Sequence, residues 1–100
     1  MNEALRKHYA ATASLGCLIC KQLGFGYVAA ELHHPFGRKN GHEFHVIPLC
    51  RSHHSEGIKK PDLGYISRHP WRRAFIAAYG SEQSLLDRVD YLLRRSNEPN

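Results

Sequence analysis

Residues 45–54 read His45-Val-Ile-Pro-Leu-Cys50-Arg-Ser-His53-His54, and this stretch decides how the chain folds. A cysteine and a histidine three residues apart on a helix share a face, so Cys50 and His53 can both contact one metal ion. A second pair lies upstream in Cys17-Leu-Ile-Cys20. The four side chains make a Cys₃His set, which is typical of structural zinc. We therefore predict a zinc site that joins two distant segments.

The cysteines have two other interpretations. A CxxC pair can be a redox motif, and thiols can also lie in a core without any ligand. A redox motif leaves Cys50 and the histidines without a role. The chain has three cysteines, an odd number that fits a disulfide framework poorly. Zinc accounts for all three at once.

Three histidines beside this set form a second group. Successive side chains on a helix are rotated by about 100°, so His54 faces away from an ion bound by His53. Neighbours on a strand point to opposite faces, so one member of the pair His33 and His34 can join His54. Two histidine ligands and a free imidazole base would suit metal-assisted hydrolysis. The alternatives are scattered surface histidines or a second structural zinc.

Composition and charge predict one small soluble domain with a polyanionic partner. The chain has 100 residues and a formal net charge of +5. Residues 1–80 carry eleven Lys and Arg against five Asp and Glu, so the basic excess accompanies the histidine-rich region. This suits nucleic acid, although a solubilising surface charge is the alternative. The opening Met1-Asn-Glu-Ala-Leu-Arg-Lys is too polar for a signal peptide, and no apolar run has membrane-spanning length, so we expect a cytoplasmic protein without a membrane partner.

Hydrophobic periodicity and turn residues predict an α+β fold. One domain is expected over residues 1–95, with a core at about 17–58, two C-terminal helices at about 70–95 and a flexible tail at 96–100. The expected elements are a helix over 3–14, a tight turn at 17–20, a strand over 26–33, a loop over 37–41, a strand over 44–49, a helix from about 50 to 57, a loop beyond 59–61, a helix from Pro70 to Tyr79 and a helix capped by Ser81 with the apolar stripe Leu85, Leu86, Val89, Leu92 and Leu93.

The run from Cys17 to His54 resembles the ββα-metal domain of the HNH endonucleases, in its zinc-stapled version. This implies a small zinc-stapled ββα-metal core flanked by an N-terminal helix and two C-terminal helices. It also implies that His33 and His54 bind a catalytic divalent metal and that His34 is the general base. His45 takes the place of the residue that orients the base, and a third-ligand role for it stays open.

Two sequence motifs are similar to those of the phage recombination enhancement (Ref) nucleases. They are His33-His34-Pro35 and Pro48-Leu-Cys50-Arg-Ser-His53-His54, followed downstream by His69-Pro-Trp-Arg-Arg-Ala-Phe75. In that family cleavage depends on a host recombinase filament. The resemblance implies a phosphodiester hydrolase that acts on DNA in phage recombination, with a recombinase–DNA filament as partner, in the cytoplasm of a bacterial host. Its products would carry 5′-phosphate and 3′-hydroxyl ends.

Further expectations concern the metal, the pH and the DNA. His33 replaces the carboxylate of many members, and imidazoles suit Mn²⁺, Co²⁺, Ni²⁺ or Zn²⁺ better than Mg²⁺, so we predict a broad metal preference with Mg²⁺ not the best. Activity should fall below about pH 6, where histidine becomes protonated. The candidates for phosphate contacts are Arg38, Lys39, Arg51, Lys59 and Lys60, with Arg72 and Arg73 ranked below them.

Two other functions fit part of the pattern. A zinc-stabilised module that binds DNA or protein without cleaving it needs only the Cys₃His set. It gives no role to His33, His34 and His54. A metal-dependent hydrolase with another substrate would use these histidines, but the basic surface disfavours it.

Overall fold

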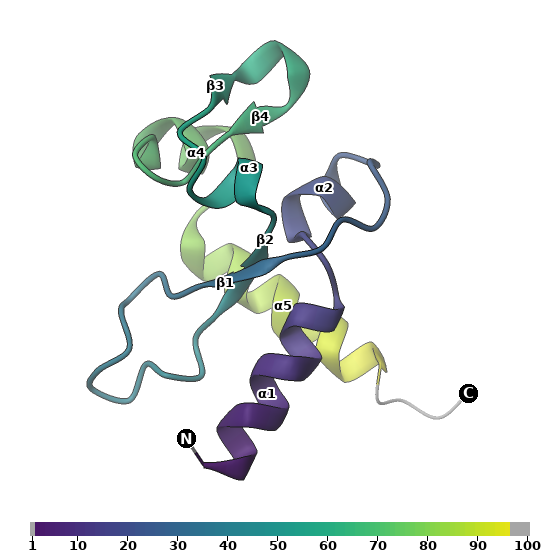
Figure 1. The fold of residues 1–100 in the computed structure, drawn as a ribbon, viewed down its shortest axis with the longest axis vertical. Coiled ribbons are helices and arrows are strands. Elements are labelled where there is room, and N and C mark those ends of the chain that lie inside the picture. The colour runs from purple at the N-terminus through teal and green to yellow at the C-terminus, as the bar shows by residue number, and fades with distance from the viewer. Residues whose placement is uncertain (1, 97–100) are drawn as a thin grey trace.

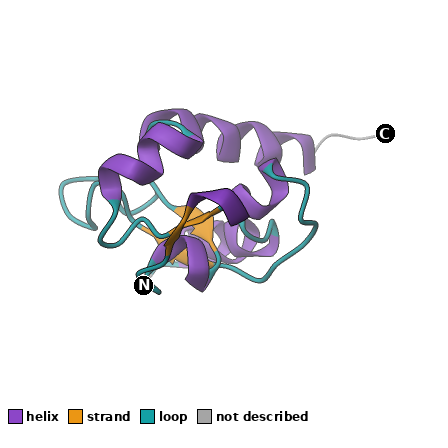
Figure 2. Ribbon diagram, turned by 90° about the horizontal axis from the view of Figure 1, so that it is seen from above, coloured by secondary structure: helices purple, strands orange, loops and turns teal. Residues whose placement is uncertain are grey.

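The computed structural model describes residues 2–96 and combines helices with two small antiparallel sheets in a compact α+β arrangement. Figure 2 shows the strands among the helices. The elements in chain order are α1 (Glu3–Ser14), α2 (Leu18–Gln22), β1 (Glu31–His33), β2 (Ile47–Leu49), α3 (Arg51–His54), β3 (Lys59–Lys60), the 3₁₀ helix η1 (Pro61–Leu63), β4 (Tyr65–Ile66), α4 (Arg72–Tyr79) and α5 (Glu82–Ser96).

The first strand pair places the site. β1 and β2 are antiparallel, with Glu31 opposite Leu49 and His33 opposite Ile47. α3 begins two residues after β2 ends, so the strand pair leads directly into this short helix. In Figure 1 the β3–β4 hairpin lies at the top of the molecule, and the loop between β1 and β2 projects to the lower left. Strand ends and α3 therefore bring the histidine-rich segments together.

The core lies between the strand pair, α2 and the C-terminal helices. Its largest fully buried side chains include Leu18, Ile19, Ile47, Leu49 and Phe75. α5 contributes Leu85, Leu86 and Val89 as predicted, with Leu92 and Leu93 packed against them at partial exposure. α1 and α5 contact each other, and both contact β2. The leucine stripe is therefore a packing face.

Several predicted elements have different bounds. The expected turn at 17–20 is the start of α2, because the Cys17 sulfur accepts the Cys20 N–H and caps a helix. The strands expected over 26–33 and 44–49 are limited to three residues each. The helix expected to reach about residue 57 ends at His54.

The segment after Lys60 also differs from the prediction of a loop. β3 pairs with β4, and η1 lies between them. Gly64 has a φ of +82°, a left-handed conformation that favours glycine and lets the chain reverse after Pro61. Pro61 predicts the end of regular secondary structure, so the sequence does not indicate this chain reversal.

The C-terminal helices largely follow the prediction. α4 begins at Arg72 rather than Pro70, and α5 is capped by Ser81, whose Oγ accepts the Ser84 N–H at 3.1 Å. Of the predicted tail, Ser96 is the last residue of α5, and residues 97–100 lie outside the described residues. Within residues 2–96, every helix is too short or too polar to cross a membrane.

Candidate metal centres and active site

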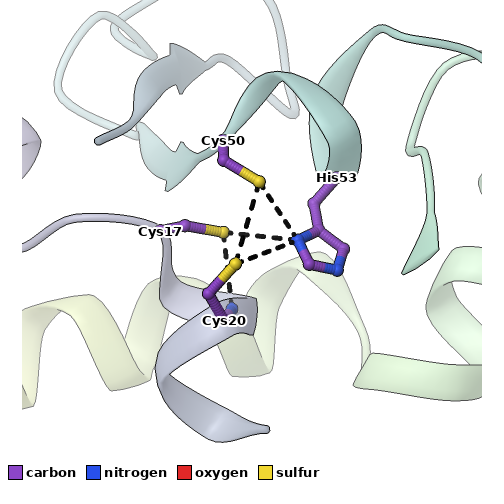
Figure 3. Close-up of side chains that lie close together, drawn as sticks. All are labelled: Cys17, Cys20, Cys50 and His53. Atoms are coloured by element: carbon purple, nitrogen blue, oxygen red, sulfur yellow. Dashed lines mark hydrogen bonds between the residues drawn. The ribbon is translucent and has the colours of Figure 1, made fainter. Parts of the chain in front are cut away.

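The Cys₃His set predicted from the sequence is a buried cluster in the structure (Figure 3). Cys17 and Cys20 come from the start of α2, and Cys50 and His53 from the start of α3. None of the four side chains is more than 6% exposed. The N-terminal end of α2 thus faces that of α3.

The distances inside the cluster match those of four ligands around one ion. The Nδ1 atom of His53 lies 3.5, 3.6 and 3.3 Å from the sulfurs of Cys17, Cys20 and Cys50, and the sulfurs of Cys20 and Cys50 are 3.8 Å apart. Zn–S bonds of about 2.3 Å and Zn–N bonds of about 2.0 Å in a tetrahedron separate two sulfurs by about 3.8 Å, and a sulfur and a nitrogen by about 3.5 Å. The cluster is therefore consistent with a zinc site.

The His53 ring is held in the orientation that zinc needs. Its Nε2 lies 2.7 Å from the carbonyl oxygen of Gly64, which only accepts, so Nε2 carries the proton. Nδ1 is then the atom with a free lone pair, and it faces the three sulfurs. The ring also stacks on Tyr65, with centroids 4.9 Å apart. Such a partner behind a ligating histidine is common at zinc sites.

The electrostatics of the thiols also favour a cation. Burial raises the pKa of Cys17, but the neighbouring His53 and the backbone near Cys50 and Cys20 outweigh it and lower this pKa to about 6. Burial and the negative charge of Cys17 raise the pKa of Cys20, and burial raises that of Cys50. Three thiolates this close repel one another, and a bound divalent cation removes that repulsion.

A second cluster consists of His33, His54 and His69. One ring nitrogen from each lies within 4.8 Å of the others, and their ring centroids are 5.1 to 5.3 Å apart. The rings come from the ends of β1 and α3 and from the segment before α4. The structure thus brings His33 and His54 together, and it adds a third histidine.

Backbone hydrogen bonds hold His69 beside α3. The Arg68 N–H donates to the His53 carbonyl at 2.9 Å, and the His69 N–H donates to the His54 carbonyl at 2.8 Å. The chain around residue 69 therefore runs along the end of the helix that carries both His53 and His54.

Two of these imidazoles are hydrogen-bonded to glutamate carboxylates. The Nε2 of His33 lies 3.1 Å from Oε1 of Glu82, and the Nδ1 of His54 lies 2.8 Å from Oε1 of Glu31. An ionised carboxylate only accepts hydrogen bonds, so these two nitrogens carry the ring protons. The lone pairs then reside on Nδ1 of His33 and Nε2 of His54. Such carboxylate–histidine pairs orient metal ligands and raise their basicity.

Burial controls the charge at this cluster. It lowers the pKa of His33 to about 4, so this ring is neutral near pH 7 even with Glu82 beside it. Burial also raises the pKa of Glu82, but hydrogen bonds from Arg68 and His33 outweigh it and hold that pKa below its ordinary value. Burial and the charge of Arg68 lower the pKa of His69. Neutral rings are the form that binds metal.

His34 points to a different set of partners from His33. Its Nε2 lies 2.9 Å from the hydroxyl of Tyr9, which itself donates to the Glu43 carbonyl at 2.9 Å. The Tyr9 hydroxyl has one proton, so His34 must donate through Nε2, and its Nδ1 keeps the lone pair. Burial and the charge of Arg38 lower the pKa of His34, which leaves the ring neutral near pH 7.

His45 lies in neither cluster. It is exposed, and its Nδ1 is 3.0 Å from Nδ1 of His42. The third histidine of the second cluster is His69 instead. The five cations predicted to contact DNA, which are Arg38, Lys39, Arg51, Lys59 and Lys60, are all exposed.

Sequence reasoning missed His69, Glu82 and Tyr9. His69 belongs to the segment that is similar to the Ref nucleases, but the sequence predicts a loop before Pro70 and assigns the histidine no ligand role. Glu82 could have been found, since it lies on the same helix face as Leu85, Leu86 and Val89 and a carboxylate on an apolar stripe needs a partner. Tyr9 gave no signal, because a tyrosine on an amphipathic helix usually packs.

Comparison with known families decides between the possible identities. Residues 3–94 match the family described as recombination enhancement, RecA-dependent nuclease. The chain belongs to this family. A search of curated proteins found no match. The predicted resemblance to the Ref nucleases is thereby confirmed over nearly the whole chain, and the family's description names a nuclease that depends on RecA.

Proposed function

We propose that this member of the RecA-dependent nuclease family is a metal-dependent DNA endonuclease of the HNH type. β1, β2 and α3 form its ββα-metal core, and the Cys₃His cluster holds structural zinc. The observation that carries the proposal is the second cluster, in which three imidazoles converge and two of them are backed by carboxylates. A module that only binds DNA has no use for such a site.

The residues of this cluster have defined parts in the proposal. His33 and His54 present their unprotonated nitrogens, and His69 supplies the third imidazole. A divalent ion bound there would stabilise the charge that develops on the phosphate and on the leaving oxygen. Glu82 and Glu31 keep the rings oriented, so that the ligands need little rearrangement.

His34 is the proposed general base. Its lone pair on Nδ1 takes a proton from water as the water oxygen attacks phosphorus. The bond between phosphorus and the 3′ oxygen breaks, and the leaving oxygen takes a proton from solvent water, which gives a 5′-phosphate and a 3′-hydroxyl end. The Tyr9 hydroxyl accepts a hydrogen bond from Nε2–H and thereby favours the tautomer in which Nδ1 is basic.

DNA held by RecA is the proposed substrate. The family name implies both a DNA substrate and RecA involvement. The exposed cations Arg38, Lys39, Arg51, Lys59 and Lys60 are proposed to contact phosphates and to position the strand without reading its sequence. His45 remains a predicted orienting residue at the loop that follows His34.

Cleavage assays test this function. Naked plasmid and DNA paired within a RecA filament are incubated with zinc-loaded protein, with Mg²⁺ and ATP held constant for the filament and Mn²⁺ added or omitted. We expect strand cleavage that increases with the filament and with Mn²⁺ and disappears in His34→Ala. His8→Gln also removes one imidazole, outside both clusters, and should cleave normally. If folded, zinc-loaded protein cuts neither substrate with any metal, it is the non-catalytic zinc module instead.

A further inference from the structure

A groove of about 430 Å³ is lined by the segment that follows His69, and the proposed cleavage step does not use it. It begins at Pro70, the residue that follows His69, and continues along the first turn of α4. The lining residues are Lys59, Pro70, Trp71, Arg72, Arg73 and Ala74. The groove therefore begins one residue along the chain from His69, one of the three histidines of the second cluster.

An oriented aromatic ring forms part of the groove. Trp71 is 38% exposed although it is the largest apolar side chain of the protein. Its Nε1–H donates to the Gly57 carbonyl at 3.0 Å, so the ring cannot turn freely. The Lys59 ammonium lies over one face of the ring, 4.9 Å from its centroid, so a base would stack on the indole by displacing this ammonium or on the opposite face. A fixed, partly open indole is a platform on which a nucleobase can stack.

The charges around this ring have one sign. Lys59, Arg72 and Arg73 are all exposed, and the described lining residues include no carboxylate. The Nη2 atom of Arg72 lies 3.9 Å from Oε2 of Glu82, but the Arg72 side chain is 59% exposed. Among the residues that line the groove, no carboxylate accompanies Lys59 or Arg73. Cations around an aromatic ring suit the two parts of a nucleotide, its phosphate and its base.

We propose that this groove binds an unpaired nucleotide of a DNA single strand, with the base stacked on Trp71 and the flanking phosphates on Lys59, Arg72 and Arg73. The inference rests on the proposed function and deepens it, because it makes an unpaired nucleotide part of the DNA substrate and places the next phosphodiester at the His69 side of the groove. A base inside a duplex is covered on both faces by its neighbours and cannot stack on Trp71. The groove therefore selects unpaired DNA.

Trp71 is the one tryptophan in the chain, so its fluorescence reports on this groove alone. Zinc-loaded protein is titrated with a thymidine oligonucleotide without added divalent metal, so that no cleavage is needed. We expect saturable quenching, weaker binding to a duplex of the same length, and no quenching by inorganic phosphate. Equal binding of duplex, quenching by phosphate alone, or no quenching by the oligonucleotide would each overturn the proposal.

Variants separate stacking from general attraction. Binding of a labelled oligonucleotide, followed by anisotropy, should weaken about 10-fold or more in Trp71→Ala and remain close to normal in Trp71→Phe. Arg73→Ala should weaken it and reduce its salt dependence. Arg88→Ala removes an exposed cation from α5 and should change little. If Trp71→Ala and Trp71→Phe, both zinc-loaded, bind like the unaltered protein, the groove is not the site.

The two proposals can fail separately. Normal cleavage without Trp71 quenching would refute nucleotide binding in the groove but not the nuclease function. Trp71 quenching by single-stranded DNA in a protein that cleaves no DNA would refute the nuclease function but not nucleotide binding in the groove.

Discussion

The Nε2 atom of His33 lies 3.1 Å from Oε1 of Glu82, although the residues are 49 positions apart in the sequence. Both side chains are almost fully buried, at 4% and 5% exposure. The first turn of α5 therefore meets the end of β1 at the proposed catalytic cluster. Arg68 donates to the same carboxylate oxygen, so one glutamate links β1, α5 and the segment that carries His69.

Glu82→Gln should weaken divalent metal binding at the second cluster by about 10- to 100-fold, because the ring of His33 loses its charged partner. The variant should also lose about 1–3 kcal/mol of stability, since Arg68 is left without a buried counter-charge. Calorimetric titration of zinc-loaded protein with Mn²⁺ measures the affinity. Asp87→Asn removes one charge from an exposed site on the same helix and should bind Mn²⁺ normally. Equal affinities in both variants would contradict a role for Glu82.

Cys50→Ala should lose zinc and cooperative folding together. Zinc bound by such ligands contributes about 10–16 kcal/mol, as much as the total stability of a typical small domain. Zinc content by mass spectrometry and thermal unfolding by circular dichroism measure the two effects. Ser55→Ala, a change in the exposed residue that follows α3, should keep both the zinc and the cooperative transition. A zinc-free Cys50→Ala protein that unfolds cooperatively would show that the cluster is not structural.

His34→Ala should slow cleavage by about 10²- to 10⁴-fold while metal affinity stays unchanged, because a general base acts on water and does not hold the ion. Single-turnover cleavage and Mn²⁺ titration on the same preparation separate the two roles. Tyr9→Phe should slow cleavage less, because it removes the acceptor that fixes the His34 tautomer but leaves the ring. A loss of metal binding in His34→Ala would make it a ligand.

Cleavage with Mn²⁺, Co²⁺ or Ni²⁺ should be faster than with Mg²⁺ at equal concentration. Three imidazoles form the cluster, and the carboxylates of Glu31 and Glu82 hydrogen-bond the rings of His54 and His33. Nitrogen ligands favour transition metals, whereas Mg²⁺ prefers oxygen. Rates on naked plasmid, where no filament imposes its own Mg²⁺ requirement, give the order. Activity in Mg²⁺ alone would show that carboxylates, not imidazoles, hold the ion.

The parts predictable from the sequence are those set by local spacing. The Cys50–His53 and Cys17–Cys20 pairs are each fixed by one turn of chain, so their meeting in one cluster could be predicted. The opposite directions of His33 and His34 follow from extended backbone in the same way, and these residues contact Glu82 and Tyr9, on different helices.

The parts of the site and of the fold that the sequence did not predict depend on contacts between distant segments. His69 reaches the cluster only because backbone hydrogen bonds pin residues 68 and 69 along α3, and no periodicity encodes those bonds. Glu82 depends on how α5 crosses the end of β1. The β3–β4 hairpin was missed because Pro61 signals a break, whereas the reversal is completed at Gly64.

Manganese titration of zinc-loaded protein, followed by electron paramagnetic resonance, tests the central claim most directly. The three-histidine cluster predicts one Mn²⁺ site per chain beyond the zinc. The affinity of that site for Mn²⁺ should fall strongly in both His54→Ala and His69→Ala, which retain their zinc. It should be unchanged in His8→Gln. No Mn²⁺ site, or one that survives both cluster variants, would contradict a catalytic metal at His33, His54 and His69.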